Sequence, residues 1–409
     1  MERIGVDPAG AAIMAPKQFH YNLKVNGLTP AQANIIKQEI LSCGGEAAVS
    51  KDAASCSVPS TDAVISGTAR QFARLIEKLG AQPYGLKPVA EDLREALDNA
   101  KKGSFVIRTA EREWTLGERT LIMGVLNITP DSFYDKGRFL EKEKAIEGGL
   151  KMAEEGADWI DVGGESTRPG ASSVDEGEEL KRVIPVIEAL SSKGLTVSVD
   201  TSKAIVAGEA IKAGAGIVND ISGMTDPRMA GVSADAGVPV VIMHMRGTPQ
   251  TMQDAVEYKD LSGEVFDYLL SRIRYALKSG INPENIIIDP GIGFGKSREG
   301  NLELIRNLSC FKTLGRPVLV GPSRKSFIGR TLDRPAGERL SGTLAVLAAA
   351  VLNGAHILRV HDVPEARDAA RMADAIKNSG AHPPPIPPGR RGGVGGGEGP
   401  ERPRRGRRA

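Results

Sequence analysis

The sequence has few of the residues that build disulfide-linked, zinc-stabilised or membrane-spanning proteins. Only three cysteines occur among its 409 residues. They are widely separated and form no C-x-x-C pair, which argues against a disulfide framework and against a structural zinc site. The longest nearly apolar run, residues 344–352, is far shorter than the roughly 20 residues that a membrane span requires. No targeting segment is recognisable near the start, so we expect a protein of the reducing cytoplasm with no membrane contact.

Aromatic residues and net charge are scarce as well. Aromatics make up 4% of the chain, and the small aliphatic side chains that replace them suit strands packed on both faces. The formal net charge is +2, yet residues 383–409 carry seven Arg and two Glu, so the rest is slightly acidic. Residues 381–409 are rich in Pro, Gly and Arg, which predicts a disordered tail. Such a tail is able to contact nucleic acid, but a solvated extension is the favoured interpretation.

The first hundred residues predict a small domain without catalytic residues. We expect residues 1–18 to be a flexible arm and residues 19–100 to form a small α/β domain of unknown role. Two strand–helix units are expected in it, and the first helix has a capping box in which Thr29 is the N-cap and Gln32 the reciprocal partner. A connector helix is expected over residues 91–102.

Residues 104–380 predict a (β/α)8 barrel. A hairpin is expected at its start, over residues 104–117. The eight expected strands are residues 121–126, 159–162, 196–199, 216–218, 240–243, 286–288, 318–320 and 357–360. Amphipathic helical stretches lie between most of them, which is typical of parallel βαβ units. A doubly wound open sheet has the same alternation. Polar residues follow every strand, however, and only a barrel brings all eight strand ends to one mouth, so this pattern favours the barrel.

Three of these polar residues form a recognisable chemical set. Asp200, Asn219 and Asp289 follow three different strands, and together they offer carboxylate acceptors and an amide that both donates and accepts. Each one alone is best interpreted as a helix cap. Three at equivalent strand ends instead predict a site for a flat heterocycle that carries amino and oxo groups.

The last two strands predict a site for phosphate. Lys325 follows the seventh strand, and Arg359 and His361 lie two residues apart at the end of the eighth, where barrels commonly hold phosphate. The stretch GIGFGKS at 291–297 fails the Walker A pattern by one residue. Its glycines predict instead a backbone that approaches a flat ligand, with Phe294 as a wall. For His244 we expect a structural or substrate-lining role, because no second His or Cys lies at ligand spacing.

Eight stretches in this order resemble the dihydropteroate synthase family. They are GVLNITPDSF (124–133), DVGGESTRPGA (161–171), SVDTSK (198–203), NDISG (219–223), DPGIGFGK (289–296), SRKSFIG (323–329), ERLSGTLA (338–345) and RVHDV (359–363). The resemblance implies an enzyme that joins a pterin carrying a diphosphate ester to p-aminobenzoate, giving dihydropteroate and pyrophosphate, with Mg2+ as cofactor. It also implies a homodimer.

The resemblance implies a role for individual residues by position. Catalytic roles fall to Asn127, Asp131, Asp135, Thr167, Arg168, Lys325, Arg359 and His361. Substrate contacts fall to Asp200, Asn219, Ile221, Met243, Asp289, Phe294, Gly321, Lys325, Ser326, Pro169 and Phe133. Asn127 is the implied Mg2+ ligand, and GGESTRPG at 163–170 resembles a mobile loop that closes over the pyrophosphate and the incoming amine.

This sequence departs from the family pattern at two places, and two other functions stay open. Tyr134 and Lys136 replace small residues in the first mobile loop, and Ile292 stands where a Phe is common. A methyltransferase of the methyltetrahydrofolate-corrinoid type shares the pterin-binding acids but has no pyrophosphate to hold. A non-catalytic pterin-binding protein is the alternative of a different class, against which the intact Lys325 and Arg359 argue.

Overall fold

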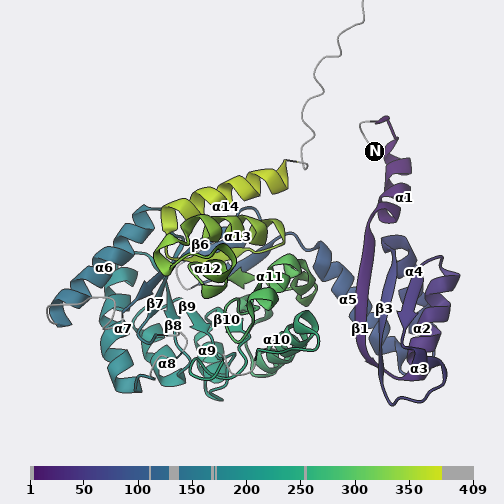
Figure 1. Cartoon of the computed structure of the whole chain (residues 1–409), viewed down its shortest axis with the longest axis horizontal. Coiled ribbons are helices and arrows are strands. Elements are labelled where there is room, and N and C mark those ends of the chain that lie inside the picture. Colours follow the sequence, from purple (N-terminus) through teal and green to yellow (C-terminus); the bar gives the residue numbers. More distant parts are fainter. Residues whose placement is uncertain are drawn as a thin grey trace, which may run out of the picture.

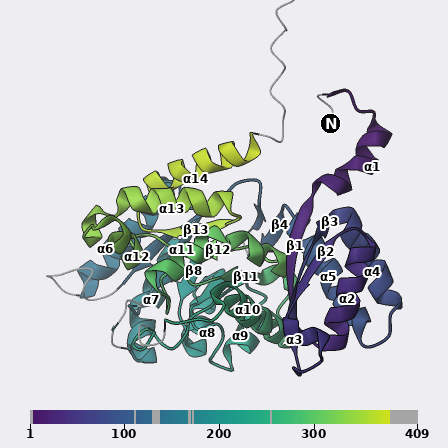
Figure 2. The same ribbon diagram turned by 45° about the vertical axis from the view of Figure 1, so that its right-hand side comes forward.

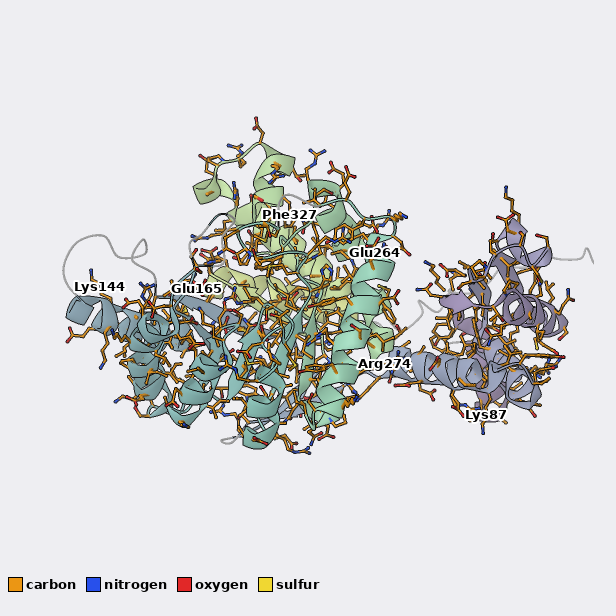
Figure 3. The ribbon with its side chains drawn as sticks, turned by 90° about the horizontal axis from the view of Figure 1, so that it is seen from below. Lys87, Lys144, Glu165, Glu264, Arg274 and Phe327 are labelled. Carbon is orange, nitrogen blue, oxygen red and sulfur yellow. The ribbon has the colours of Figure 1, made fainter. Side chains whose placement is uncertain are left out.

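The computed structural model describes residues 4–109, 112–128, 138–166, 170, 173–252 and 256–379. It consists of a small N-terminal α/β domain and a larger barrel, joined by one helix (Figure 1). Seen from below, that helix bridges the space between the two (Figure 3). None of the helices in these ranges combines the length and apolar character that crossing a bilayer requires.

The N-terminal domain is a three-stranded antiparallel sheet packed against helices. Its elements are β1 (His20–Leu28), α2 (Pro30–Ser42), β2 (Glu46–Val49), α3 (Lys51–Ala54), β3 (Thr61–Thr68), α4 (Ala69–Ala81) and α5 (Leu86–Lys101). The strand order is β1-β3-β2. Thr29 and Thr68 both begin their helices with complete capping boxes. Ile36, Ile65 and Phe72 are fully buried between the sheet and the helices.

The sequence pattern missed β2 and placed the start of the connector helix too late. The Ala-rich strand β2 has one β-branched residue and alternates only weakly in burial. Within the predicted arm lies helix α1 (Pro8–Gln18), which begins where the Asp7 carboxylate accepts from the Gly10 N–H at 2.9 Å. No side chain of α1 is buried, and the helix projects away from the domain (Figure 2). The connector helix α5 begins earlier than expected, because Gly85 adopts a left-handed conformation (φ 72°) directly before it.

Eight parallel strands close into a barrel, which confirms the predicted fold class. They are β6 (Leu121–Asn127), β7 (Trp159–Gly163), β8 (Thr196–Asp200), β9 (Ile217–Asp220), β10 (Val240–Met243), β11 (Ile286–Asp289), β12 (Leu319–Val320) and β13 (Ile357–Val360). Neighbours pair in the order β11-β10-β9-β8-β7-β6-β13-β12. A parallel bridge between Ile288 and Val318 joins β11 to β12 and completes the circle.

Helices surround the strands and the predicted hairpin lies beneath them. The helices are α6 (Arg138–Glu154), α7 (Glu176–Ser191), α8 (Ala204–Lys212), α9 (Met229–Ala236), α10 (Leu261–Lys278), α11 (Arg298–Arg306), α12 (Ser326–Leu332), α13 (Leu340–Leu352) and α14 (Val363–Asn378), with short 3-10 turns η3 (Pro283–Asn285), η4 (Leu308–Leu314) and η5 (Ala336–Glu338). The hairpin pairs β4 (Phe105–Arg108) with β5 (Glu113–Leu116). Its Phe105, Ile107 and Leu116 pack against inward-facing residues such as Trp159 and Ile217. This apolar plug fills one end of the barrel, and the polar residues at the carboxyl ends of the strands lie at the other end.

Candidate active site at the carboxyl ends of the strands

The polar residues predicted from the strand ends lie side by side because the strands are in register. Asn127 pairs with Gly163, Gly163 with Asp200, and Asp200 with Asn219, each the last or next-to-last residue of its strand. Asp289 ends β11 opposite Met243 of β10. The barrel therefore brings Asn127 and Asp289, which are 162 positions apart in the sequence, to one rim.

A small, partly enclosed cavity opens at this rim. It is lined by Asn219, Ile221, Met243, Asp289, Ile292, Phe294, Gly321, Lys325 and Arg359. Eight of these nine residues were predicted as substrate-binding or catalytic, and Ile292 is the residue that departs from the family pattern. Ile221, Met243 and Phe294 also form a small apolar cluster of their own. The cavity thus combines apolar walls with acidic, amide and cationic groups.

Arg359 is the centre of a buried ionic network. Its Nε donates to Asp161 Oδ2 at 2.6 Å and its Nη2 to Asp200 Oδ2 at 2.5 Å. Asn219 Nδ2 also donates to Asp161 Oδ2, at 3.0 Å. Burial opposes the positive charge, but Asp161 and Asp200 raise the pKa of the Arg359 guanidinium above its ordinary value. Burial raises the pKa of Asp200 to about 7 even though Arg359 pulls it down.

Asp289 and Lys325 place a second pair of opposite charges in the cavity. Burial raises the pKa of the Asp289 carboxyl to about 6, while the Gly291 N–H donates to its Oδ1 at 2.7 Å. Burial lowers the pKa of the Lys325 ammonium to about 8. The Lys325 Nζ also lies 3.8 Å from the centre of the Phe294 ring, a cation–π contact that fixes both side chains. Both groups change charge near neutral pH, which is common at functional sites.

The geometry suits a flat polar heterocycle, and the comparisons with known proteins give the same result. Residues 123–361 match the family model described as pterin binding enzyme. The chain belongs to the dihydropteroate synthase family. It is 49% identical to the dihydropteroate synthase of Synechocystis over 263 residues, which are 64% of this chain and 91% of that protein.

Solved structures of family members match the barrel. The dihydropteroate synthase of Xanthomonas albilineans with 4-aminobenzoic acid is 44% identical with a TM-score of 0.63, and covers 67% of this chain and 98% of its own. The same organism's enzyme in complex with 7,8-dihydropteroate is 41% identical with a TM-score of 0.61, over 66% and 98%.

Two longer relatives also match residues outside the barrel. The probable bifunctional folylpolyglutamate synthase/dihydropteroate synthase of Halobacterium salinarum is 45% identical over 377 residues, which are 92% of this chain. This chain spans only 45% of that relative's length, and 42% of a similar protein from Haloferax volcanii.

A buried lysine that sequence reasoning missed shapes the glycine-rich loop of the family motif DPGIGFGK. Lys296 Nζ donates to the Gly291 carbonyl at 2.9 Å and the Phe294 carbonyl at 2.8 Å, and lies 3.0 Å from His244 Nδ1. Burial lowers the pKa of Lys296 to about 7 and that of His244 to about 3. A neutral His244 therefore lies within hydrogen-bond distance of Lys296. This agrees with the structural role expected for it.

The burial of Asp161 and two ion pairs of Lys203 near the rim were not predicted. Asp161 is fully buried within β7, and a charged residue inside an otherwise apolar strand was the signal available for it. Lys203 Nζ donates to Glu179 Oε2 at 2.5 Å and to the Glu165 carboxylate. Glu165 belongs to the second loop motif, so this triad fastens the start of that loop to α7 and α8.

The phosphate-site residues occupy different environments. His361 Nδ1 lies 3.0 Å from Ser323 Oγ, and burial lowers the pKa of His361 to about 4, so its ring is neutral at pH 7. Ser326 is exposed at the start of α12 and does not line the cavity. Asp131, Phe133, Asp135, Thr167, Arg168 and Pro169 lie outside the described residues, as do the predicted tail and the two variant positions of the first loop.

The surroundings of Asn127, the implied Mg2+ ligand, show what kind of metal site it could form. Among the described residues, no three His, Cys, Asp or Glu side chains cluster to hold a metal. Mg2+ commonly keeps several waters and is bound through one or two protein oxygens plus substrate phosphates. Asn127 is partly exposed at the end of β6, in the same row as Asp200. Its amide oxygen fits a metal that is held mainly by the substrate.

Proposed function

We propose that this chain is a dihydropteroate synthase, which condenses 6-hydroxymethyl-7,8-dihydropterin diphosphate with p-aminobenzoate to give 7,8-dihydropteroate and pyrophosphate. The observation that carries the proposal is the cavity in which Asn219 and Asp289 face Lys325 and Arg359 between the walls of Ile221 and Phe294. The family's solved structures with 4-aminobenzoic acid and 7,8-dihydropteroate support it.

The cavity matches a pterin in hydrogen-bonding character. A pterin presents an amino group and a ring N–H on one edge and a carbonyl oxygen beside them. Carboxylates only accept when ionised, so Asp289 suits the amino edge, whereas Lys325 only donates and suits the carbonyl oxygen. Asn219 does both. Discrimination is strong in such a site because a ligand that lacks these groups leaves buried polar atoms without partners.

The reaction requires charge stabilisation more than a strong base. The aryl amine is neutral at pH 7; its nitrogen forms a bond to the pterin methylene carbon, the carbon–oxygen bond to the diphosphate breaks, and the amine loses a proton to solvent. Asp200 and Asp289 stabilise the positive charge that develops on the pterin. Bound Mg2+ held through Asn127 would neutralise the departing diphosphate.

Arg359 serves the acids as well as the predicted diphosphate. Its two donated bonds to Asp161 and Asp200 keep Asp200 available as an ion near neutral pH, because the guanidinium lowers a pKa that burial raises. His361, whose pKa burial lowers in the unliganded site, would donate a hydrogen bond to the diphosphate.

The proposal is tested by mixing the purified chain with the pterin diphosphate, p-aminobenzoate and Mg2+ and measuring both pyrophosphate and dihydropteroate. Equal yields of the two products are expected, with no product when either substrate or Mg2+ is omitted. The test requires a parallel reaction with a family enzyme of known activity. Absence of both products while that parallel reaction proceeds would reject the proposal.

We also propose a homodimer that forms through the helices at one side of the barrel. Large apolar side chains are exposed there on four helices that contact one another: Leu302, Leu332, Leu352, Met372 and Ile376 on α11, α12, α13 and α14. Exposed apolar groups that gather in this way mark interaction surfaces. Light scattering is expected to give twice the chain mass, and Leu352→Glu with Met372→Glu to give monomers. A monomeric parent chain would reject the dimer.

A further inference from the structure

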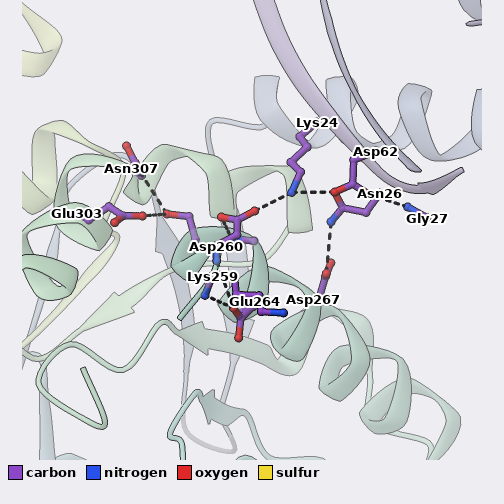
Figure 4. Close-up of polar contacts among 12 residues, drawn as sticks. Lys24, Asn26, Gly27, Asp62, Lys259, Asp260, Glu264, Asp267, Glu303 and Asn307 are labelled. Atoms are coloured by element: carbon purple, nitrogen blue, oxygen red, sulfur yellow. Dashed lines mark hydrogen bonds and ion pairs between the residues drawn. The ribbon is translucent and has the colours of Figure 1, made fainter. Parts of the chain in front are cut away.

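The N-terminal domain contacts the barrel at the start of helix α10. Lys24 of β1 donates from Nζ to Asp260 Oδ2 at 2.7 Å, and the same ammonium lies 3.2 Å from Asp62 Oδ2 of its own domain (Figure 4). Asn26 Nδ2 donates to Asp267 Oδ2, further along α10, at 3.3 Å. Lys24 therefore bridges one carboxylate of each domain.

Asp260 and Glu264 together determine where α10 begins. Asp260 is the N-cap and accepts from the Gly263 N–H at 3.0 Å. The Glu264 carboxylate accepts in turn from the backbone N–H groups of Lys259 and Asp260, at 2.9 and 3.2 Å. Lys24 thus contacts the residue whose side chain and backbone both take part in this cap.

From Glu264 a continuous set of contacts leads to the cavity. Arg246 Nη2 donates to Glu264 Oε2 at 2.6 Å, and its guanidinium lies 3.7 Å from the centre of the Tyr258 ring. The Tyr258 hydroxyl donates to the Gly295 carbonyl at 2.8 Å. Gly295 follows Phe294, whose ring forms the cavity wall against Lys325.

We propose that Lys24 is a positioning residue for the ligand cavity: by holding Asp260 it fixes the start of α10 and, through Arg246 and Tyr258, the loop that carries Phe294. The N-terminal domain would then act as a brace for the barrel. This inference rests on the proposed function only in taking the pterin diphosphate as the ligand of the cavity.

A second attachment keeps the domain in place when Lys24 is changed. Helix α5 packs against η4 below the barrel, where Asn99 Nδ2 donates to the Thr313 carbonyl at 3.0 Å. Lys24 is partly exposed, with 41% of its side chain accessible. Its replacement therefore leaves both domain cores intact and removes the ammonium that joins Asp260 to Asp62.

The test compares full-length chains that carry Lys24→Glu, Lys24→Arg or, as a matched control, Lys87→Ala. Lys87 is an exposed lysine of α5 for which the described residues provide no ion pair. Amide hydrogen exchange without ligand is measured over residues 256–264 and 291–297, and then kcat and KM for the pterin diphosphate. In Lys24→Glu the new carboxylate repels Asp260 and Asp62. We expect faster exchange in both segments and a KM raised about two- to five-fold, as for an exposed ion pair, with kcat unchanged. Lys24→Arg and Lys87→Ala are expected to match the parent.

A double-mutant cycle with Tyr258→Phe tests whether the effect passes through the tyrosine hydroxyl. Coupled residues give non-additive effects, so Lys24→Glu is expected to add little to the KM in the Tyr258→Phe chain. Unchanged exchange over residues 291–297, an unchanged KM, or fully additive effects would each overturn the proposal. A parent chain without synthase activity would reject the proposed function instead, and the exchange data would still decide whether Lys24 braces the loop.

Discussion

Replacing Arg359 by Met removes the cation from the buried network and leaves its length nearly unchanged. Asp161 and Asp200, whose side chains are 0% and 4% exposed, then lose their charged partner. Removing one member of a buried ion pair costs about 3–5 kcal/mol of unfolding free energy. Arg334→Met is the matched control, because Arg334 and Glu338 form an exposed pair at 3.0 Å, and such pairs contribute about 0–1 kcal/mol.

The loss in Arg359→Met is expected to depend on pH with a defined sign. The folded-state pKa of Asp200 is about 7, above its ordinary value near 3.8, so the folded protein holds this proton more tightly than the unfolded chain. Stability from this group is therefore complete below about pH 4 and is lost as pH rises through 7. Without the guanidinium that lowers it, the pKa rises further. The variant should be most destabilised at pH 8 and less at pH 5, where a proton replaces the missing cation.

Urea unfolding followed by tryptophan fluorescence measures this effect in the barrel alone. The chain has two tryptophans, and Trp114 and Trp159 pack edge to face, 5.9 Å apart, at the plugged end of the barrel. Adding Asp200→Asn to Arg359→Met should recover part of the loss, because it removes one of the unpaired carboxylates. If Arg359→Met at pH 8 were no less stable than Arg334→Met, or equally destabilised at pH 5, the network would not hold the site together as argued.

Three further changes test the cavity. Asp289→Asn puts an N–H2 group where the pterin amino edge needs an acceptor, so calorimetry should show affinity for a pterin reduced on the order of 100-fold. Asp235→Asn, at an exposed position, should bind the pterin normally. Equal pterin affinities of these two variants would exclude Asp289 as a ligand. Because the pKa of Lys325 is about 8, its charged form and the pterin affinity should decline as pH rises through 8. Lys325→Arg should keep a pH-independent affinity up to pH 9. An affinity of the parent chain that does not change between pH 7 and 9 would contradict this. Gly291→Ala places a Cβ 1.9 Å from the His244 carbonyl oxygen, at a φ of 71°. Thermal unfolding should therefore show that the free energy of unfolding falls by more than about 2 kcal/mol. A normal melting temperature would mean that the loop moves freely.

Local patterns in the sequence were enough to locate the eight strands and the polar residues at their ends, whereas Ile221, Met243 and Gly321 of the cavity came only from the family resemblance. Each strand is a short aliphatic run, and the run ends where a polar residue begins, so the positions of Asp200, Asn219 and Asp289 follow from where the strands stop. The start of the helix at Thr29 could be predicted in the same way, from its capping box. These features depend on neighbours a few residues away, which is the range over which hydrophobic periodicity and capping act.

Local sequence patterns could not predict the partners of the buried charges. Asp161 and Arg359 are 198 residues apart and Asp200 and Arg359 are 159 apart, so their contact exists only once the barrel has closed. The role of Lys296, in the GIGFGKS stretch, could not be predicted either. No local pattern shows that its side chain folds back onto the carbonyls of its own loop.

The sequence by itself determined the fold class, the order of the strands along the chain and the polar residue at each strand end, because these depend on periodicity and local capping. Tertiary structure alone decided that Arg359 joins Asp161 to Asp200, that Lys296 supports the Phe294 wall, and that Lys24 reaches Asp260 across the domains. These pairings depend on strand register and barrel closure. Burial at the closed rim then moves the pKa values of the acids and lysines toward neutrality.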